Sequence, residues 1–548
     1  MNSLKPMLLS SLKNYDKSQF VKDVTAGIIV AIIALPLSIA LALASGVGPE
    51  AGIFTAIVAG FVISALGGSS VQIAGPTAAF ATIVAGIVAH DGMDGLIVAT
   101  ILAGIFLILM GLCHFGSLIK FIPFTITTGF TSGIAVTIVI GQLKDFFGLT
   151  YPTGVKPIET VEKFEAVVNN FSTINMDAVI VGVVSLAILI IAPYIFKRIP
   201  GSLLAVIAGI AMVQLLPLKV NTIGNLYTIS NALPSLHFPS LSLNIIQNAL
   251  PNALTIAVLA AIESLLSCAV ADGMINGKYR SDMELVAQGA GNIASALFGG
   301  IPATGAIART AANIKNGGRT PIAGMVHSIT LVIVLVVLMP YAGMIPMPTI
   351  AAILFIVAYN MCQWRTFVNL VKTAPKSDII VLVTSFVLTV IFDLVVAIEV
   401  GMVLACLLFI KRMSEETKVN GWTYVDDDTP DVDEHLQKLP LQIRVYEISG
   451  PLFFGAASVI EEIAVKDFTK CLVLRMRSVP ALDSTALNAL KDLVQVCESK
   501  GITIVFSHVN NQPMKVMEKA GFIELVGKEN FQLNISAALD RAEEIIHK

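Results

Sequence analysis

The chain has 548 residues, of which 55% are hydrophobic and 13% are charged, and its formal net charge is −3. Soluble domains carry about 25% charged residues, so this composition excludes an ordinary soluble protein and indicates one that crosses a membrane several times. The small net charge gives no support to nucleic-acid binding, and no nucleic-acid partner is expected.

The first 20 residues are polar and basic and lack a cleavable signal pattern, so they are expected to form a cytoplasmic segment. Residues 21–412 are predicted to form a polytopic α-helical transmembrane domain, because a spanning helix needs about 20 apolar residues. About fourteen segments fit this requirement, at residues 23–45, 50–66, 71–89, 94–113, 121–147, 177–196, 202–218, 248–272, 283–299, 303–316, 321–341, 346–362, 378–393 and 395–411.

The distribution of lysine and arginine predicts the orientation of these spans, because cytoplasmic loops are enriched in both residues. With the N-terminus inside, the basic residues of the inner loops are Lys120, Lys197, Arg198, Lys278, Arg280, Lys315, Arg319, Arg365, Lys372, Lys376, Lys411 and Arg412. The outer loops hold only Lys156, Lys163 and Lys219. The pattern predicts a multi-pass protein of the plasma membrane with both termini in the cytoplasm.

Two polar, glycine- and proline-containing segments interrupt the third and tenth spans, at residues 74–79 and 301–310. A broken helix at membrane depth is tolerated only where protein or a water-filled cavity satisfies the freed backbone groups. Equivalent breaks in two seven-span halves of opposite topology predict a transporter's binding site. The first turn of each new helix offers free N–H groups to an anion, so Thr77, Ala78 and Ala79 are candidate ligand-binding residues.

Two ionisable residues lie deep in apolar sequence. Arg309 follows Gly305 by one helical turn, and a buried arginine in a membrane usually serves function. Glu263 has no nearby basic residue in its span, so burial favours its protonated form and makes it a candidate proton carrier, with Ser267 one turn away. An alternative interpretation is that Glu263 and Arg309 form a purely structural ion pair.

Other reactive side chains give weaker signals. Asp393 and Glu399 lie near a predicted turn and are expected to be interfacial or to cap a helix. Histidines are expected at loops or span ends, namely His90, His114, His237 and His327. The six cysteines and these histidines show no metal-ligand spacing. No metal, cofactor or enzymatic activity is therefore expected.

The composition changes after Arg412. Residues 413–438 are predicted to be an acidic linker, with the acidic cluster Asp426, Asp427, Asp428, Asp431, Asp433 and Glu434. Residues 439–548 have soluble composition, with strands predicted at 441–448, 471–476 and 502–506 and helices at 456–465, 483–500 and 512–520. Strands that alternate with helices predict a small α/β domain with a mostly parallel sheet.

Several motifs are similar to those of one known family. They lie at residues 35–40, 71–77, 121–124, 129–135, 262–267 and 299–324, and in the C-terminal part at 449–455 and 479–485. With them the chain resembles the sulfate permease family (SulP, related to solute carrier family 26), and its C-terminal part resembles the STAS domain of anti-sigma-factor antagonists.

The resemblance implies a seven-plus-seven inverted repeat like that of uracil permeases, usually assembled as a homodimer. A core domain of spans one to four and eight to eleven would carry the anion past a gate domain of the other spans in an elevator-like motion. Arg309 matches the family's anion-site arginine, and Glu263 and Ser267 match an acidic and a hydroxyl position on the eighth span. Gly305, Ala306 and Ile307 match the backbone segment that lines the pocket.

Departures from the family pattern bear on coupling. Family members with sodium-dependent bicarbonate activity look to have a hydroxyl residue where this chain has Ile307. They look to have an aspartate where this chain has Glu263. Isoleucine cannot bind sodium, so coupling to protons through Glu263 is favoured. Ser484 matches the position that is phosphorylated in the antagonists, and here it is interpreted as a helix N-cap.

The expected function is secondary active transport of a small inorganic anion, sulfate first, with protons. Three alternatives stay open at this point. The first is a bicarbonate or four-carbon dicarboxylate transporter of the same fold, and the second is an anion channel. The third is a membrane-tethered STAS signalling module with a cytoplasmic partner.

Overall fold

The computed structural model describes residues 4–117, 123–152, 157–196, 200–230, 232–239, 243–392, 394–422, 439–456, 458–461, 463 and 468–547. The chain forms two compact units, Met1–Met402 and Val403–Lys548. Several residues used above lie outside the described ranges: Lys120, Lys156, Lys197, Arg198, Asp393 and the acidic cluster of the predicted linker.

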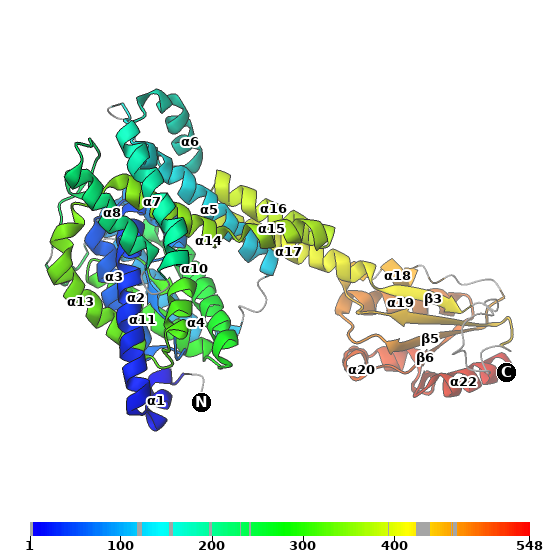
Figure 1. Ribbon diagram of the computed structural model, residues 1–548. Coiled ribbons are helices and arrows are strands. Elements are labelled where there is room, and N and C mark those ends of the chain that lie inside the picture. The colour runs from blue at the N-terminus through cyan, green and yellow to red at the C-terminus, as the bar shows by residue number, and fades with distance from the viewer. Residues whose placement is uncertain are drawn as a thin grey trace. The chain divides into compact units, whose positions relative to one another are not determined.

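The described part of the first unit consists of helices and one short sheet (Figure 1). The helices are α1 (Met7–Ser11), α2 (Lys17–Ala44), α3 (Pro49–Leu66), α4 (Ala78–Leu112), α5 (Phe124–Phe147), α6 (Thr160–Asn169), α7 (Met176–Ile195), α8 (Gly201–Leu215), α9 (Ile223–Leu226), α10 (Leu243–Ile275), α11 (Ser281–Leu297), α12 (Ile307–Lys315), α13 (Ile322–Ala342), α14 (Met347–Cys362), α15 (Trp364–Thr373), α16 (Lys376–Ile391) and α17 (Leu394–Glu415).

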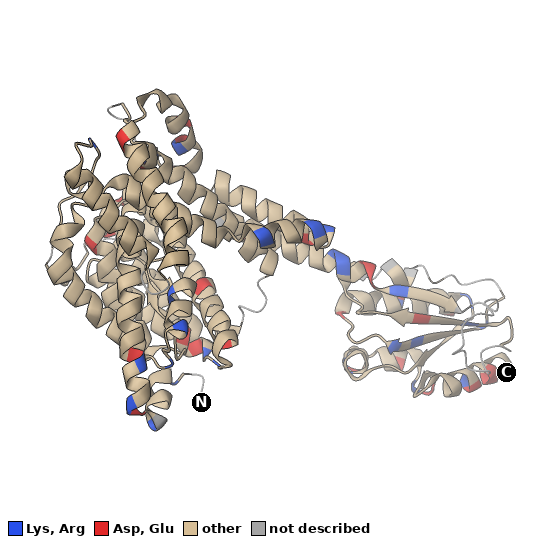
Figure 2. Cartoon of the chain, viewed as in Figure 1, with Lys and Arg blue, Asp and Glu red and all other residues tan. Residues whose placement is uncertain are grey.

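The helices agree in place with the apolar segments of the sequence. Each of the fourteen predicted ranges contains helix, and α4 holds two of them, separated by a break at Gly92, where φ is 70°. Among the described residues, eight helical segments are long and apolar enough to cross a membrane. Figure 2 shows few charged residues along the helices of this unit.

The helices of the first unit pack mainly within two groups. In the first group α4 packs on α10 and α11, α13 packs on α2 and α3, and α12 packs on α10 and α2. In the second group α5 packs on α14 and α16, and α7 packs on α8 and α14. Glycine permits a close approach of α4 and α11, because a Cβ atom on Gly104 of α4 would lie 2.6 Å from the Gly289 carbonyl oxygen of α11.

The second unit contains a five-stranded sheet of order β3-β4-β5-β6-β7. Its strands are β3 (Lys418–Trp422), β4 (Ile443–Ser449), β5 (Cys471–Ser478), β6 (Thr503–Ser507) and β7 (Phe531–Gln532), and only β3 runs antiparallel to its neighbour. The remaining helices are α18 (Ser458–Glu461), α19 (Ser484–Ser499), α20 (Asn511–Lys519), α21 (Phe522–Val526) and α22 (Ile535–His547).

Side chains that alternate along the strands form two hydrophobic clusters. Leu472 and Phe506 belong to a cluster with residues of α19, whereas Val473 and Val505 belong to a cluster with residues of α22. This arrangement confirms the predicted α/β domain with a mostly parallel sheet, although strand β3 begins at Lys418, inside the range predicted as a linker. The interpretation of Ser484 as the N-cap of α19 is wrong, because Asp483 is the cap and accepts a hydrogen bond from the Ala486 N–H at 2.8 Å.

Candidate functional site

The two breaks predicted from the sequence meet in a two-stranded antiparallel sheet. Strand β1 (Ala74–Gly75) pairs with β2 (Thr304–Gly305), and the Ala306 N–H donates to the Ile73 carbonyl at 2.9 Å. Helix α4 begins three residues after β1, and α12 begins two residues after β2. Because the strands are antiparallel, the two helices, whose starts lie 229 residues apart in the sequence, begin at opposite ends of this small sheet, which is called the β1–β2 crossing below.

The side chains of neighbouring helices satisfy the backbone of the second break. Asn292 accepts a hydrogen bond from the Ala303 N–H at 2.8 Å and donates one to the Ala303 carbonyl at 2.9 Å. The Thr55 hydroxyl accepts a hydrogen bond from the Ile301 N–H at 2.7 Å. Protein thus takes up the backbone groups that the break frees, as membrane depth requires.

By contrast, the starts of α4 and α12 are not capped by side chains. The N-cap residues are Thr77 and Ala306, and neither makes a side-chain cap hydrogen bond. Most first-turn N–H groups have no partner within their own helix, although the Phe80 N–H of α4 donates to the Thr77 carbonyl at 3.3 Å. Both helix starts can therefore donate backbone hydrogen bonds to an anion, with the favourable end of each helix dipole.

Arg309, the third residue of α12, is 2% exposed. Its Nη2 atom makes two long hydrogen bonds, to the Ser38 hydroxyl at 3.4 Å and to the Pro76 carbonyl at 3.3 Å. Its Nη1 atom has no hydrogen-bond partner among the described residues, and no described carboxylate lies within 4.0 Å of the guanidinium group. The protein thus buries a cation without supplying its counter-ion, which favours binding of an anion.

The two glycines of the crossing are required for space. A Cβ atom on Gly75 would lie 2.5 Å from Nη1 of Arg309, and one on Gly305 would lie 2.4 Å from Nε2 of Gln72. Real Cβ contacts are not this short. Gly75 therefore lets the guanidinium group lie against the first strand, and Gly305 lets the Gln72 amide lie against the second.

Glu263 contacts the start of α4 rather than Arg309. The Thr77 hydroxyl donates to Oε2 of half-buried Glu263 at 2.9 Å. The two charged residues are both described, and they form no ion pair within 4.0 Å. The alternative of a structural ion pair between them is therefore not observed, and Glu263 is linked instead to the start of α4 through Thr77.

Ser267, one turn after Glu263 on α10, contacts α12 through Thr310. It is 1% exposed, and its hydroxyl is 3.5 Å from that of Thr310. Thr310 in turn accepts a hydrogen bond from the Ile73 N–H at 3.0 Å. The contacts of Ser267 thus support the β1–β2 crossing.

The other predicted site residues differ in exposure. Ala78 and Ala79 are buried, Gly305 is buried and Ala306 is half-buried. Ile307 is 43% exposed although it is apolar and lies in the first turn of α12. Ile307 and the neighbouring Ala308 are therefore exposed at this helix start, and neither side chain offers an oxygen to a cation.

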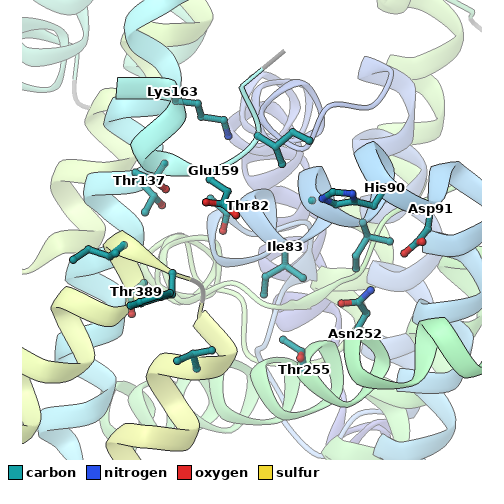
Figure 3. A pocket seen from close by; sticks show the side chains of 17 residues that line it. Thr82, Ile83, His90, Asp91, Thr137, Glu159, Lys163, Asn252, Thr255 and Thr389 are labelled. Atoms are coloured by element: carbon teal, nitrogen blue, oxygen red, sulfur yellow. The ribbon is translucent and has the colours of Figure 1, made fainter. Parts of the chain in front are cut away.

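A separate cavity of about 370 Å³ lies between helices of the two groups (Figure 3). Thr82 of α4 and Thr255 of α10 line one side, and Lys163 of α6 points into it. Burial lowers the pKa of the Lys163 ammonium group, and the Glu162 carboxylate opposes this shift. None of the predicted site residues lines the cavity. Thr255 precedes Glu263 by eight residues, or about 12 Å along α10.

The structure also shows buried ionisable residues that sequence reasoning missed. Glu284 and Asp23 are both 0% exposed and accept several hydrogen bonds. His327 is the sixth residue of α13 and is 0% exposed, so the expectation that it lies at a loop or span end is wrong. Neither ring nitrogen of His327 has a hydrogen-bond partner among the described residues. Asp23 and Glu284 are the first and second residues of their predicted spans, where an acid is usually exposed, so these positions carried no signal of burial.

Comparison with known proteins gives the same family over the whole chain. The model of the sulfate permease family matches residues 20–385, and the STAS domain model matches residues 437–541. The chain is 38% identical over 530 residues to the "Putative sulfate transporter YvdB" of Bacillus subtilis (strain 168), covering 95% of this chain and 97% of the relative. It is 30% identical over 538 residues to the "Bicarbonate transporter BicA" of Picosynechococcus sp., with 95% and 94% covered.

Solved structures share the fold. Murine Slc26a9 in the inward-facing state matches with a TM-score of 0.88 and 19% identity, over 99% of this chain and 94% of that one. The transmembrane domain of a cyanobacterial bicarbonate transporter, BicA, matches with a TM-score of 0.62 and 28% identity, over 71% and 98% of the two chains. The expectations of a polytopic helical membrane protein and of a non-enzymatic function are confirmed. The chain therefore belongs to the sulfate permease family and is a multi-pass membrane anion transporter with a C-terminal STAS domain.

Proposed function

We propose that this protein is a secondary active transporter of sulfate in the plasma membrane, coupled to protons. The observation that carries the proposal is Arg309, a fully buried guanidinium group with one nitrogen unpartnered among the described residues and no carboxylate within 4.0 Å. A cation kept in this state at the joint of two helix starts requires a bound anion to offset its charge.

The anion would lie between the starts of α4 and α12. Thr77, Ala78 and Ala79 would bind it from one side, and Gly305, Ala306 and Ile307 from the other. Each helix dipole contributes about half a positive charge, so the two dipoles with Arg309 supply roughly two positive charges. This total matches a divalent oxyanion such as sulfate.

Glu263 would carry the coupled proton. A carboxyl group in this environment is more easily buried when it is protonated. The Thr77–Glu263 hydrogen bond supports coupling, because Thr77 is also the N-cap of the helix that would bind the anion. Ile307 offers no sodium ligand at the start of α12, which favours protons over sodium. Ser267 would act by supporting the crossing behind the site.

Transport would use an elevator-type motion of one helix group against the other. We assign the fourteen predicted spans to two inverted seven-span repeats, with α2–α4 and α10–α13 as the core and α5–α8, α14, α16 and α17 as the gate. The packing of the helices in two groups supports this assignment, and so does the cavity lined by α4 and α10 of one group and α5 and α16 of the other. The protein would act as a homodimer with both termini in the cytoplasm.

Bicarbonate is the second candidate substrate. A relative with 30% identity over nearly the whole chain is named a bicarbonate transporter. Backbone N–H groups and one arginine bind small oxyanions of several shapes, so the site chemistry is compatible with both anions.

Uptake into proteoliposomes tests the proposal. Labelled sulfate, bicarbonate and succinate are each offered with and without inward proton and sodium gradients. We expect saturable sulfate uptake that an inward proton gradient accelerates, and loss of that acceleration in Glu263→Gln. Glu415→Gln is the matched control, because Glu415 is 66% exposed at the end of α17. Uptake of bicarbonate alone, or acceleration by sodium alone, would overturn the assignment.

A further inference from the structure

Glu284 is a buried carboxyl group of the first unit that the proposed transport cycle does not use. It is the fourth residue of α11 and is 0% exposed. Its Oε2 atom accepts hydrogen bonds from the N–H groups of Gly68 at 2.9 Å and Ser69 at 3.3 Å. Its Oε1 atom accepts hydrogen bonds from the side chains of Gln72 at 2.7 Å, Gln288 at 2.9 Å and Ser264 at 3.1 Å.

The hydrogen-bond pattern fits an ionised carboxylate that is held by dipoles alone. All five groups donate, and no described basic side chain lies within 4.0 Å of Glu284. The carboxylate also lies in the first turn of α11, where the helix dipole favours a negative charge. Burying a charge at membrane depth costs free energy, and apolar residues would fill the same space without that cost. A buried carboxylate at this place therefore indicates a functional role.

Gln72 links this carboxylate to strand β2 of the proposed anion site. Its Nε2 atom donates to Glu284 and, at 2.8 Å, to Ser264, so both amide hydrogens are used. Its Oε1 atom accepts a hydrogen bond from the Cys268 thiol at 2.6 Å. The same amide lies against Gly305, where any Cβ atom would collide with it. The orientation of Gln72 therefore sets the position of β2, and three hydrogen bonds fix that orientation.

Ser264 links the same carboxylate to α10. It accepts a hydrogen bond from Gln72, donates one to Glu284 and directly follows Glu263 in the chain. Glu284 thus connects the segment before β1, the strand β2 and the helix that carries Glu263. These three parts of the chain must keep their relative positions if Arg309 and the two helix starts are to face one anion.

We propose that Glu284 is a positioning residue of the anion site, which acts through Gln72 on the β1–β2 crossing. The inference rests on the proposed anion site at Arg309 and adds a residue that sets its geometry. Glu284 does not touch the anion and does not carry the coupled proton. Its loss should therefore weaken anion binding and leave the proton dependence of transport in place.

The variant Glu284→Gln tests this role with little change of shape. The glutamine NH₂ group replaces one of the two carboxylate oxygens and then faces hydrogen-bond donors. The hydrogen bonds that this oxygen accepted are therefore lost. We expect the KM for sulfate uptake to rise about tenfold, the fold-change for one charge-assisted hydrogen bond, with the maximal rate and the acceleration by protons retained. Glu415→Gln is the matched control and should keep the wild-type KM.

Gln72→Met is the second variant, used also if Glu284→Gln does not fold. It removes the link between Glu284 and Gly305 but leaves the other donors to the carboxylate, and we expect the same rise in KM. Wild-type KM in both variants, or a lower thermal stability with unchanged KM, would overturn the positioning role. Loss of the acceleration by protons in Glu284→Gln would also overturn it. If the wild type transports another anion, the proposed substrate fails, and the same KM comparison is made with that anion.

Discussion

The guanidinium group of Arg309 lies against the α-carbon of Gly75, so closely that a Cβ atom there would be 2.5 Å from Nη1. This contact joins the second break to the first across 234 residues of sequence. It brings the charge of Arg309 to the start of α4, because Gly75 lies three residues before Ala78. The fit of arginine to glycine therefore aligns the charged group with both helix starts.

Replacement of Gly75 by alanine should displace this guanidinium group. Overpacking typically costs about 1–3 kcal/mol, so we expect the KM for sulfate to rise at least about fivefold in proteoliposome uptake. Gly273→Ala on α10 is the control, because a Cβ atom there meets nothing within 4 Å. Equal KM values in the two variants would contradict the role given to the contact.

Replacement of Thr77 by valine should disconnect Glu263 from the start of α4. A hydrogen bond to a charged group is worth about 1.5–3 kcal/mol, so we expect proton-driven sulfate uptake to fall about tenfold. Thr100→Val is the control on the same helix, because the Thr100 hydroxyl bonds only the Leu96 carbonyl one turn away. If both variants accumulate sulfate like the wild type under a proton gradient, Thr77 has no part in coupling.

Replacement of Asp23 by asparagine should destabilise the first unit. Asp23 is fully buried and ties the start of α2 to the segment before α13, accepting from the Arg319 N–H at 2.8 Å and from the Thr320 hydroxyl at 2.6 Å. We expect a loss of about 2–4 kcal/mol, read as a lower thermal midpoint in detergent. Asp16→Asn should change little, because asparagine caps a helix as well as aspartate does.

Replacement of Asp483 by alanine should weaken the STAS domain. Its side chain accepts hydrogen bonds from the N–H groups of Ala486 and Phe454, each at 2.8 Å. We expect a loss of about 1–2 kcal/mol for the cap of α19. Ser484→Ala should stay within about 0.5 kcal/mol, the usual range for a substitution away from such features. The free energies of unfolding of the two variants are compared by denaturation followed by tryptophan fluorescence. A larger loss in Ser484→Ala than in Asp483→Ala would contradict the assignment of Asp483 as the cap.

Local sequence patterns were enough to predict the helices that position the site. Apolar runs of sufficient length predicted the eight long apolar helical segments of the described residues, and the glycine–proline breaks predicted where α4 and α12 would begin. Burial of Arg309 followed from its place one turn into a broken span. Each of these features depends on a short stretch of chain, so no tertiary contact was needed to infer it.

Features that depend on distant contacts could not be inferred in this way. Glu284 follows Asp282 in the first turn of a helix, a common and usually exposed place for an acid. Only its contact with the segment before β1 shows that it is buried. The burial of His327 depends on packing between helices, so the sequence alone does not show that this residue is buried within α13. Asp483 and Ser484 are both good capping residues, and the backbone conformation decides between them.

Equilibrium binding of labelled sulfate to the purified protein tests the central claim most directly. The wild type and Arg309→Gln are compared in detergent without any gradient, so that binding is separated from coupling. We expect saturable binding to the wild type and at least about a hundredfold weaker binding to the variant, since breaking a buried charge interaction costs about 3–5 kcal/mol. Equal affinity in the two proteins would contradict an anion site at Arg309.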